Sequence, residues 1–324
     1  MYQPKAFRLL LRPLLFLLAL HLVAHGASAA AISLDVLQRD GFGMVEIKRP
    51  QPNVLTVIAE INGRKVRLIV DTGWGSDGIS MDSGLFNAAG MPTEGSGEFG
   101  RSASGKDLGE VKRVRAERVV IGNVEIKNVP LYVGSFRALR NEQFRRQTAA
   151  EGFIGAGFLR TCSAVVDLQN LKLYLRPPGT GRRAVLGPAL RGAGLAEVPF
   201  EVTGHNCLVE VEINEFAGTM FLDTGASLAG LDSRVAPKIK ASAYKSRAGF
   251  IDAAGVISQT ELAKLRSFKI GGVPARASDI RMGKYGFYVD TRGKVIGLLG
   301  MDILGPNGTI IDFGAKKLYF YPLT

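Results

Sequence analysis

Short apolar or alternating runs, each bounded by turn residues, dominate the hydrophobic pattern of this chain. Clear examples are residues 54–61, 66–70, 119–121 and 172–175. Runs of this length and alternation predict β-strands. Helical periodicity is rare, and we expect helices only over residues 136–150, near 236–246, and after Gly157 and Asp302. The pattern therefore predicts an all-β fold.

Three blocks of sequence recur in the same order along the chain. Ile61-Asn62 and residues 68–73 recur as Ile213-Asn214 and residues 220–225, an offset of 152. Residues 152–177 resemble residues 297–322, and a weaker block pairs 120–124 with 269–273. Ordered blocks with slightly different offsets indicate a duplicated domain with loops of different length. We expect two lobes, residues 40–176 and 195–324, joined by an exposed Pro-, Gly- and Arg-rich linker over 177–194.

Residues 1–29 have the features of a secretory signal peptide. Basic residues at the start precede an apolar run over 14–24 and the small residues Ala27-Ser28-Ala29. The run is shorter than the roughly 20 residues of a membrane span, so we expect cleavage, no span afterwards, and a periplasmic or secreted protein. Whether residues 30–50 are a removable pro-segment, and whether Cys162 and Cys207 pair, stays open.

Composition and charge exclude several kinds of site. The chain has 324 residues, a net charge of +12, two cysteines and three histidines, and only His205 lies outside the predicted signal peptide. These counts disfavour a multi-histidine metal centre and a Cys₄ zinc site. The basic stretch 137–146 is typical of a solvated face rather than a nucleic-acid site, because Phe136 and Phe144 do not interleave with its charges. We expect no metal and no nucleic-acid partner.

The repeated Asp-Thr-Gly motif points to specific chemistry. Each copy, Asp71-Thr72-Gly73 and Asp223-Thr224-Gly225, follows an apolar strand. Two such turns facing each other would place two carboxylates together, and these would share one proton. The ionised group can take a proton from water that attacks a carbonyl, while the protonated group polarises the carbonyl oxygen. This chemistry needs neither a histidine nor a cofactor.

On these motifs the sequence resembles the aspartic proteases of the pepsin and retropepsin superfamily. Residues 153–155 and 298–300 match the apolar-apolar-Gly elements of that family. The resemblance covers most of residues 50–324 and implies two homologous β-barrel lobes with the active cleft between them. It implies that Asp71 and Asp223 are the catalytic pair. Thr72 with Gly73 and Thr224 with Gly225 would support the pair, the threonines by crossed hydrogen bonds.

The resemblance also implies flap hairpins over the cleft. The candidates are residues 99–107, with a turn at Ala103-Ser104-Gly105, and 250–257, with a turn at Ala253-Ala254-Gly255. Ser104, Gly105, Ala254 and Gly255 are candidate substrate-binding residues. So is Trp74, which stands where the family usually has a small residue. Trp74 could line the substrate pocket, crowd the two aspartates, or pack as core.

We therefore expect a monomeric, secreted or periplasmic aspartic endopeptidase that acts on protein or peptide substrates without a cofactor. The alternative is a catalytically inactive peptide-binding or scaffold protein that has kept the fold. The placement of Asp71 relative to Asp223 separates the two hypotheses.

Overall fold

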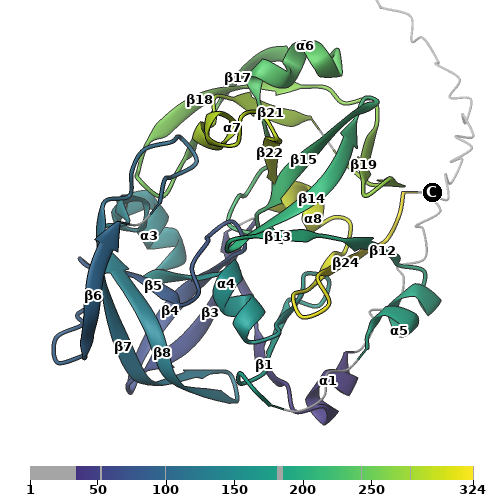
Figure 1. Cartoon of the computed structure of the whole chain (residues 1–324). Helices are drawn as coiled ribbons and strands as arrows, with labels where there is room; N and C mark the ends of the chain where they lie inside the picture. Colours follow the sequence, from purple (N-terminus) through teal and green to yellow (C-terminus); the bar gives the residue numbers. More distant parts are fainter. Residues whose placement is uncertain are drawn as a thin grey trace, which may run out of the picture. The chain divides into compact units, whose positions relative to one another are not determined.

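The computed structural model describes residues 34–51, 53–98, 100–180, 185–241, 243–277 and 279–323. These residues belong to one compact unit. The predicted signal peptide, residues 1–29, lies outside the described residues. Figure 1 shows the strands and short helices of this unit, coloured along the sequence.

The first half of the chain forms an eight-stranded sheet in the order β2-β3-β4-β9-β5-β8-β7-β6. Strand β7 also pairs with β3, so six of the strands close into a barrel. The predicted strands 54–61 and 172–175 have these bounds in the structure, as β3 and β11. The strands of this sheet are β2 (Lys48–Gln51), β3 (Val54–Ile61), β4 (Arg64–Asp71), β5 (Ile79–Asp82), β6 (Thr93–Glu98), β7 (Glu110–Ile121), β8 (Val124–Gly134) and β9 (Gly152–Gly155).

The second half repeats this topology with an interruption. Its ten-stranded sheet runs β17-β18-β21-β16-β22-β15-β14-β19-β20, and β13 pairs with β14. Two strands, β18 and β19, occupy the place of the single strand β7. The strands are β13 (Glu201–Thr203), β14 (Asn206–Ile213), β15 (Phe216–Leu222), β16 (Gly230–Asp232), β17 (Ala243–Ile251), β18 (Ile257–Ala263), β19 (Phe268–Ile270), β20 (Val273–Pro274), β21 (Ile280–Gly283) and β22 (Val295–Leu299).

A third sheet contains strands from both halves, in the order β1-β11-β10-β23-β24-β12. Its central pair, β10 with β23, is antiparallel and aligns Val166 with Ile311. Asp167 and Asp312 end these two strands and accept backbone N–H bonds from the turns that follow, a structural role. The strands are β1 (Gly43–Glu46), β10 (Val165–Asp167), β11 (Lys172–Leu175), β12 (Ala196–Pro199), β23 (Ile310–Asp312) and β24 (Lys317–Phe320). The lobe boundaries predicted above stay a prediction.

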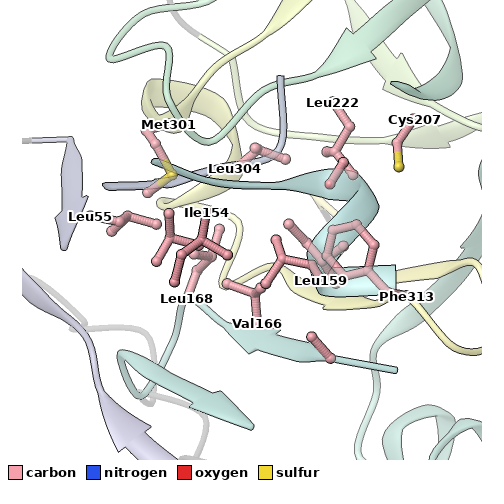
Figure 2. Close-up of a cluster of buried hydrophobic side chains, with 14 of the residues drawn as sticks. Leu55, Ile154, Leu159, Val166, Leu168, Cys207, Leu222, Met301, Leu304 and Phe313 are labelled. Atoms are coloured by element: carbon pink, nitrogen blue, oxygen red, sulfur yellow. The ribbon is translucent and has the colours of Figure 1, made fainter. Parts of the chain in front are cut away.

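The largest hydrophobic core is continuous between the halves. Figure 2 shows Leu55, Ile154 and Val166 of the first half in one cluster with Leu222 and Met301 of the second. Burial of apolar surface on this scale is the main force that holds such layers together. The core therefore fixes the two halves against each other and, with them, the loops at the ends of β4 and β15.

The helices are short, and the structure corrects two predictions about them. A single helix over 136–150 is wrong, because Asn141 has an extended backbone and its side chain caps a second helix by accepting the Phe144 N–H at 3.0 Å. The helix near 236–246 ends at Ile239, since Lys240 is left-handed (φ 48°), and β17 follows. The predicted helical pieces after Gly157 and Asp302 are confirmed as part of α4 and α8. The helices are α1 (Asp35–Arg39), α2 (Arg137–Arg140), α3 (Glu142–Thr148), α4 (Ala156–Thr161), α5 (Gly187–Gly192), the 3₁₀ turn Ser233–Val235, α6 (Ala236–Ile239), α7 (Gly286–Asp290) and α8 (Met301–Leu304).

Part of the predicted linker is not exposed. Leu186 and Leu190, at and within α5, are buried in a cluster that also contains Leu37 and Phe42. Strand β1 pairs with β11 next to this cluster. Apolar contacts therefore hold both the end of the linker and the described part of segment 30–50 in the folded unit.

Both cysteines, Cys162 and Cys207, are buried and free. Burial raises the pKa of each thiol to about 12, so neither is a reactive thiolate near neutral pH. Among the described residues, no helix has the length and apolar character of a membrane span. In the same part of the chain, His, Cys, Asp and Glu side chains form no group that could hold a metal ion.

Candidate active site

The loops that follow β4 and β15 bring Asp71 and Asp223 together. Their carboxyl groups lie within hydrogen-bonding reach of each other and line one cavity. Two buried carboxyl groups at such a separation cannot both ionise easily, so sharing one proton is the favourable state. The two aspartates are called the dyad below.

Two threonines cross between the loops beneath the dyad. The Thr72 hydroxyl donates to the Leu222 carbonyl at 2.8 Å, and the Thr224 hydroxyl donates to the Val70 carbonyl at 2.8 Å. Each hydroxyl also accepts the backbone N–H of the other threonine, at 2.9 and 3.1 Å. Both side chains are fully buried, where unpaired polar groups would be costly. The four bonds therefore fix one loop against the other.

The glycines of the two motifs lie directly against the opposite carboxyl groups. A Cβ on Gly73 would stand 2.5 Å from Asp223 Cγ, and a Cβ on Gly225 would stand 2.2 Å from Asp71 Cγ. No side chain fits at these separations. Each glycine is thus required by the carboxylate of the other half, not by the turn of its own loop.

The apolar-apolar-Gly elements lie beside these loops, as the sequence predicts. The N–H of Ala156, after Gly155, donates to the Trp74 carbonyl at 2.9 Å. The N–H of Met301, after Gly300, donates to the Ala226 carbonyl at 2.9 Å. Equivalent bonds in the two halves hold the residue that follows each Asp-Thr-Gly motif.

Burial raises the pKa of both dyad carboxyl groups, and it raises the pKa of Asp71 further. Loss of hydration is the first cause for each. The charge of Asp223 and the hydrogen bond with it add to the rise for Asp71. Backbone N–H groups oppose the rise on both sides: Asp223 Oδ1 accepts those of Ala226 and Gly225 at 2.9 and 3.0 Å, and Asp71 Oδ1 accepts that of Gly73 at 2.9 Å. The two carboxyl groups therefore titrate as a coupled pair rather than as two separate acids.

Trp74 packs away from the dyad. Its indole is 7% exposed, stacks on Phe153 with ring centroids 4.5 Å apart, and meets Phe136 edge-on at 5.0 Å. Its Nε1 donates to the Ser80 hydroxyl at 2.8 Å. The indole thus belongs to the core and also forms part of a cavity wall. Because the indole packs into this cluster while Asp71 and Asp223 stay within reach of each other, Trp74 does not crowd the aspartates.

A cavity of about 420 Å³ lies over the dyad. The first half lines it with mainly apolar side chains, and the second half lines it with a mixture of polar and apolar ones. Most of these residues could not be predicted from the sequence, since they are far apart in the chain and share no motif. They include Gln51, Ile69, Phe144 and Phe153 from the first half, and Ser227, Leu228, Asp252, Arg281, Tyr285 and Leu298 from the second.

Two hairpins meet over the cavity, one from each half. The Ser104 N–H at the first tip donates to Asp252 Oδ2 at the second tip, at 3.1 Å. The first tip also reaches α7, where the Gly286 N–H donates to the Ala103 carbonyl at 3.0 Å. The second tip reaches α2, where the Ala138 N–H donates to the Ala253 carbonyl at 3.4 Å. Each hairpin therefore bonds to the opposite half.

The predicted flap residues lie at these tips but not in the cavity lining. Ser102, Ala103, Asp252 and Ala253 line the cavity instead. Gly105 packs on Gly286, and Gly255 faces Arg137 of α2. The predicted residues Ser104, Gly105, Ala254 and Gly255 thus serve the contacts between hairpin and lobe, one or two positions away from the residues that face the dyad.

Comparison with known families gives one result. The sequence model of the family described as "gag-polyprotein putative aspartyl protease" matches the chain twice, over residues 57–143 and 209–306. Together the two stretches cover more than half of the chain, and each contains one Asp-Thr-Gly loop. A search of curated proteins finds no significant match.

Proposed function

The chain belongs to the retropepsin-like aspartyl protease family, and on this premise we propose that it is an aspartic endopeptidase with Asp71 and Asp223 as its catalytic pair. The observation that carries the proposal is the placement of the two buried carboxyl groups within hydrogen-bonding reach of each other, under one cavity. A chain that had kept only the fold would have no need to bury two carboxyl groups together, since their mutual repulsion and lost hydration oppose folding.

In the singly protonated pair, the ionised aspartate takes a proton from a water molecule as the water oxygen bonds to the carbonyl carbon of the substrate. The protonated aspartate donates its proton to the carbonyl oxygen. The C–N bond of the resulting tetrahedral intermediate then breaks: the first aspartate passes the water-derived proton to the leaving amine, and the second takes a proton back from a hydroxyl group as the carbonyl re-forms. Asp71 and Asp223 titrate as a unit and share these two roles.

We also propose that one chain suffices and that it works outside the cytoplasm. Both catalytic loops lie in one polypeptide, and the threonine bonds already join its two halves. Specific activity should then be unchanged by dilution, whereas an enzyme that needs a dimer would lose activity. The proposal of export rests on residues 1–29, and the N-terminal peptide of the mature protein, identified by mass spectrometry, checks it.

The decisive experiment replaces each catalytic carboxyl group. Asp71→Asn and Asp223→Asn should each lower kcat on a cleaved peptide by at least a factor of about 10² to 10⁴, because an amide cannot exchange the proton. Asp40→Asn, which lies outside the cavity, is the matched control and should keep activity. Circular dichroism should show all three variants folded.

Two outcomes would overturn the proposal. Near-normal turnover by either dyad variant would show that the dyad does not perform the reaction. A folded wild-type chain that binds peptides but cleaves none, from a library that covers all residue types, would support the peptide-binding alternative.

A further inference from the structure

Equivalent positions in the two halves surround the dyad with different side chains. The strand registers establish the equivalence, since Ser80 pairs with Tyr132 as Gly230 pairs with Arg281. The pairs lie at the same place in each sheet, two residues before the aspartates that end β5 and β16. Tyr132 and Arg281 are therefore structural counterparts.

In the first half, aromatic side chains fill the space between these strands and the dyad loop. The Trp74 indole occupies this space and bonds to Ser80. Tyr132 turns elsewhere, because its hydroxyl donates to Asp77. It lines a neighbouring cleft and not the cavity over the dyad.

In the second half, the corresponding residues are small. Ala226 stands where the first half has Trp74, and Gly230 stands where it has Ser80. The Tyr285 hydroxyl enters this space, only 2.1 Å from where a Cβ on Gly230 would lie. Arg281 lines the cavity beside it. The two smaller residues therefore leave room for the Tyr285 hydroxyl in the second half, and Arg281 lines the cavity there.

Outside the dyad, the other charged groups that line the cavity are Asp252 and Arg101 of the two hairpins. Asp252 accepts the N–H groups of Ser104 and Val256. Arg101 is bonded to Asp107 and Asp290, and its side chain is 55% exposed. Arg281 is therefore the half-buried cationic group that faces the cavity from a strand of the described structure.

Arg281 interacts with Asp302 of α8 and with Tyr285. Its charge opposes the rise in the pKa of the buried Asp302 carboxyl group, whose Oδ1 accepts the Ala229 N–H at 2.7 Å. A guanidinium has five N–H donors in a planar fork, so it can serve this neighbour and a further carboxylate together. Arg281 lines the same cavity as Asp71 and Asp223, so a ligand group bound to it would lie in the cavity that holds the dyad.

We propose that Arg281 determines specificity by binding an acidic side chain of the peptide substrate, on the side of the cleaved bond that the second half holds. The first half offers the apolar wall of Trp74, Phe144 and Phe153 to the other side. This inference rests on the proposed function. It names the chemistry that distinguishes the two sides of a cleaved bond: an apolar side chain on one side and a carboxylate on the other.

The test measures kcat/KM on matched peptides. Starting from a cleaved peptide, Glu, Gln and Lys are placed in turn at each of the three positions on either side of the cleaved bond. At one position the wild-type chain should prefer Glu to Gln by about ten- to a hundredfold, as expected for a charge-assisted hydrogen bond, and Lys should be poorest. Arg281→Gln should bring the Glu/Gln ratio close to one, and Arg281→Lys should keep part of it.

Arg101→Gln is the matched control, since it removes a positive charge that also lines the cavity. It should keep the Glu/Gln ratio, whereas a general effect of positive potential would lower the ratio in both arginine variants. The inference is overturned if the wild-type ratio is near one at every position, or if the ratio survives in a folded Arg281→Gln variant. If the Arg281→Gln variant does not fold, the wild-type kcat/KM values decide. A preference for Glu over Gln with Lys poorest supports the inference, and any other order overturns it.

Failure of the proposed function would look different. In that case the wild-type chain would cleave no peptide, or cleavage would survive in Asp71→Asn. Cleavage that depends on the dyad but ignores acidic residues would refute only the role of Arg281.

Discussion

The two halves of the molecule agree closely at the dyad and differ around it. Both halves present an aspartate, a threonine that bonds across to the other half, and a glycine pressed against the opposite carboxyl group. One residue further along, the first half has the buried Trp74 and the second half has Ala226. The difference shows which positions the shared chemistry constrains and which can diverge to shape a pocket.

The sheets of the two halves show the same contrast. In the first half β7 runs unbroken for 12 residues and closes the barrel on β3. In the second half the corresponding strand stops at Ala263 and resumes at Phe268. Asn62 and Asn214 nevertheless play one role, since each side-chain oxygen accepts a backbone N–H from this strand region. The repeated asparagine thus bonds to the same strand region in both halves, although the pairing of that strand differs between them.

The largest expected effect tests the region in which the halves agree. Gly225→Ala and Gly73→Ala should each abolish activity, because the added Cβ would lie 2.2 or 2.5 Å from a catalytic carboxyl carbon and must displace it. A misplaced catalytic group commonly costs a factor of about 10² or more in rate. Cleavage of a peptide substrate is the measurement. Gly192→Ala is the control, since a Cβ there meets no atom within 4 Å, and full activity in either loop variant would refute the described dyad.

The next prediction tests the region in which the halves differ. Trp74→Ala gives the first half the residue of the second and should destabilise the fold by about 3–5 kcal/mol, since it empties a core position packed on Phe153 and Phe136. Trp74→Phe keeps an aromatic ring and should cost less. Urea unfolding should be followed by circular dichroism rather than by tryptophan fluorescence, because Trp74 is the only tryptophan in the chain and both variants remove it. A loss below about 1 kcal/mol for Trp74→Ala would show that the indole is not a core residue.

Repetition explains why the dyad could be predicted from the sequence. Two copies of Asp-Thr-Gly, each with its apolar-apolar-Gly block, determine the aspartates, the crossed threonines and the approximate flap turns. Each of these features depends on a local motif and on the twofold relation between the copies. The placement of Trp74 stayed open, because a tryptophan after such a loop fits a pocket wall and a core equally well.

The cavity walls and the shared sheet depend on contacts between distant segments. Gln51, Phe144 and Arg281 carry no local sign that they face the dyad. One signal for Arg281 was present, since residues 280–283 align with residues 131–134 as equivalent strands. The Pro-, Gly- and Arg-rich composition around α5 predicts an exposed segment, so the burial of α5 could not be predicted from the sequence. Only two leucines of that segment, Leu186 and Leu190, reach the core.

The smallest expected effect concerns pH and the dyad that both halves build. Activity should rise as the pair loses its first proton and fall as it loses the second. Burial raises the pKa of both carboxyl groups above the ordinary aspartate range near 4. Both limbs of the kcat/KM profile therefore move upward, and the optimum should lie in the mildly acidic to neutral range.

A lack of hydroxyl donors to the dyad, among the described residues, agrees with the upward direction of this shift. The donors to the dyad carboxylates among the described residues are backbone N–H groups and the partner carboxyl group. The Ser76 hydroxyl donates to the Gly78 carbonyl instead, at 2.9 Å. Ala226→Ser would place a new donor beside Asp223, favour its charged form, and move the acidic limb to lower pH. A wild-type optimum near pH 3, or an Ala226→Ser profile displaced toward alkaline pH, would show that burial does not control the dyad as described.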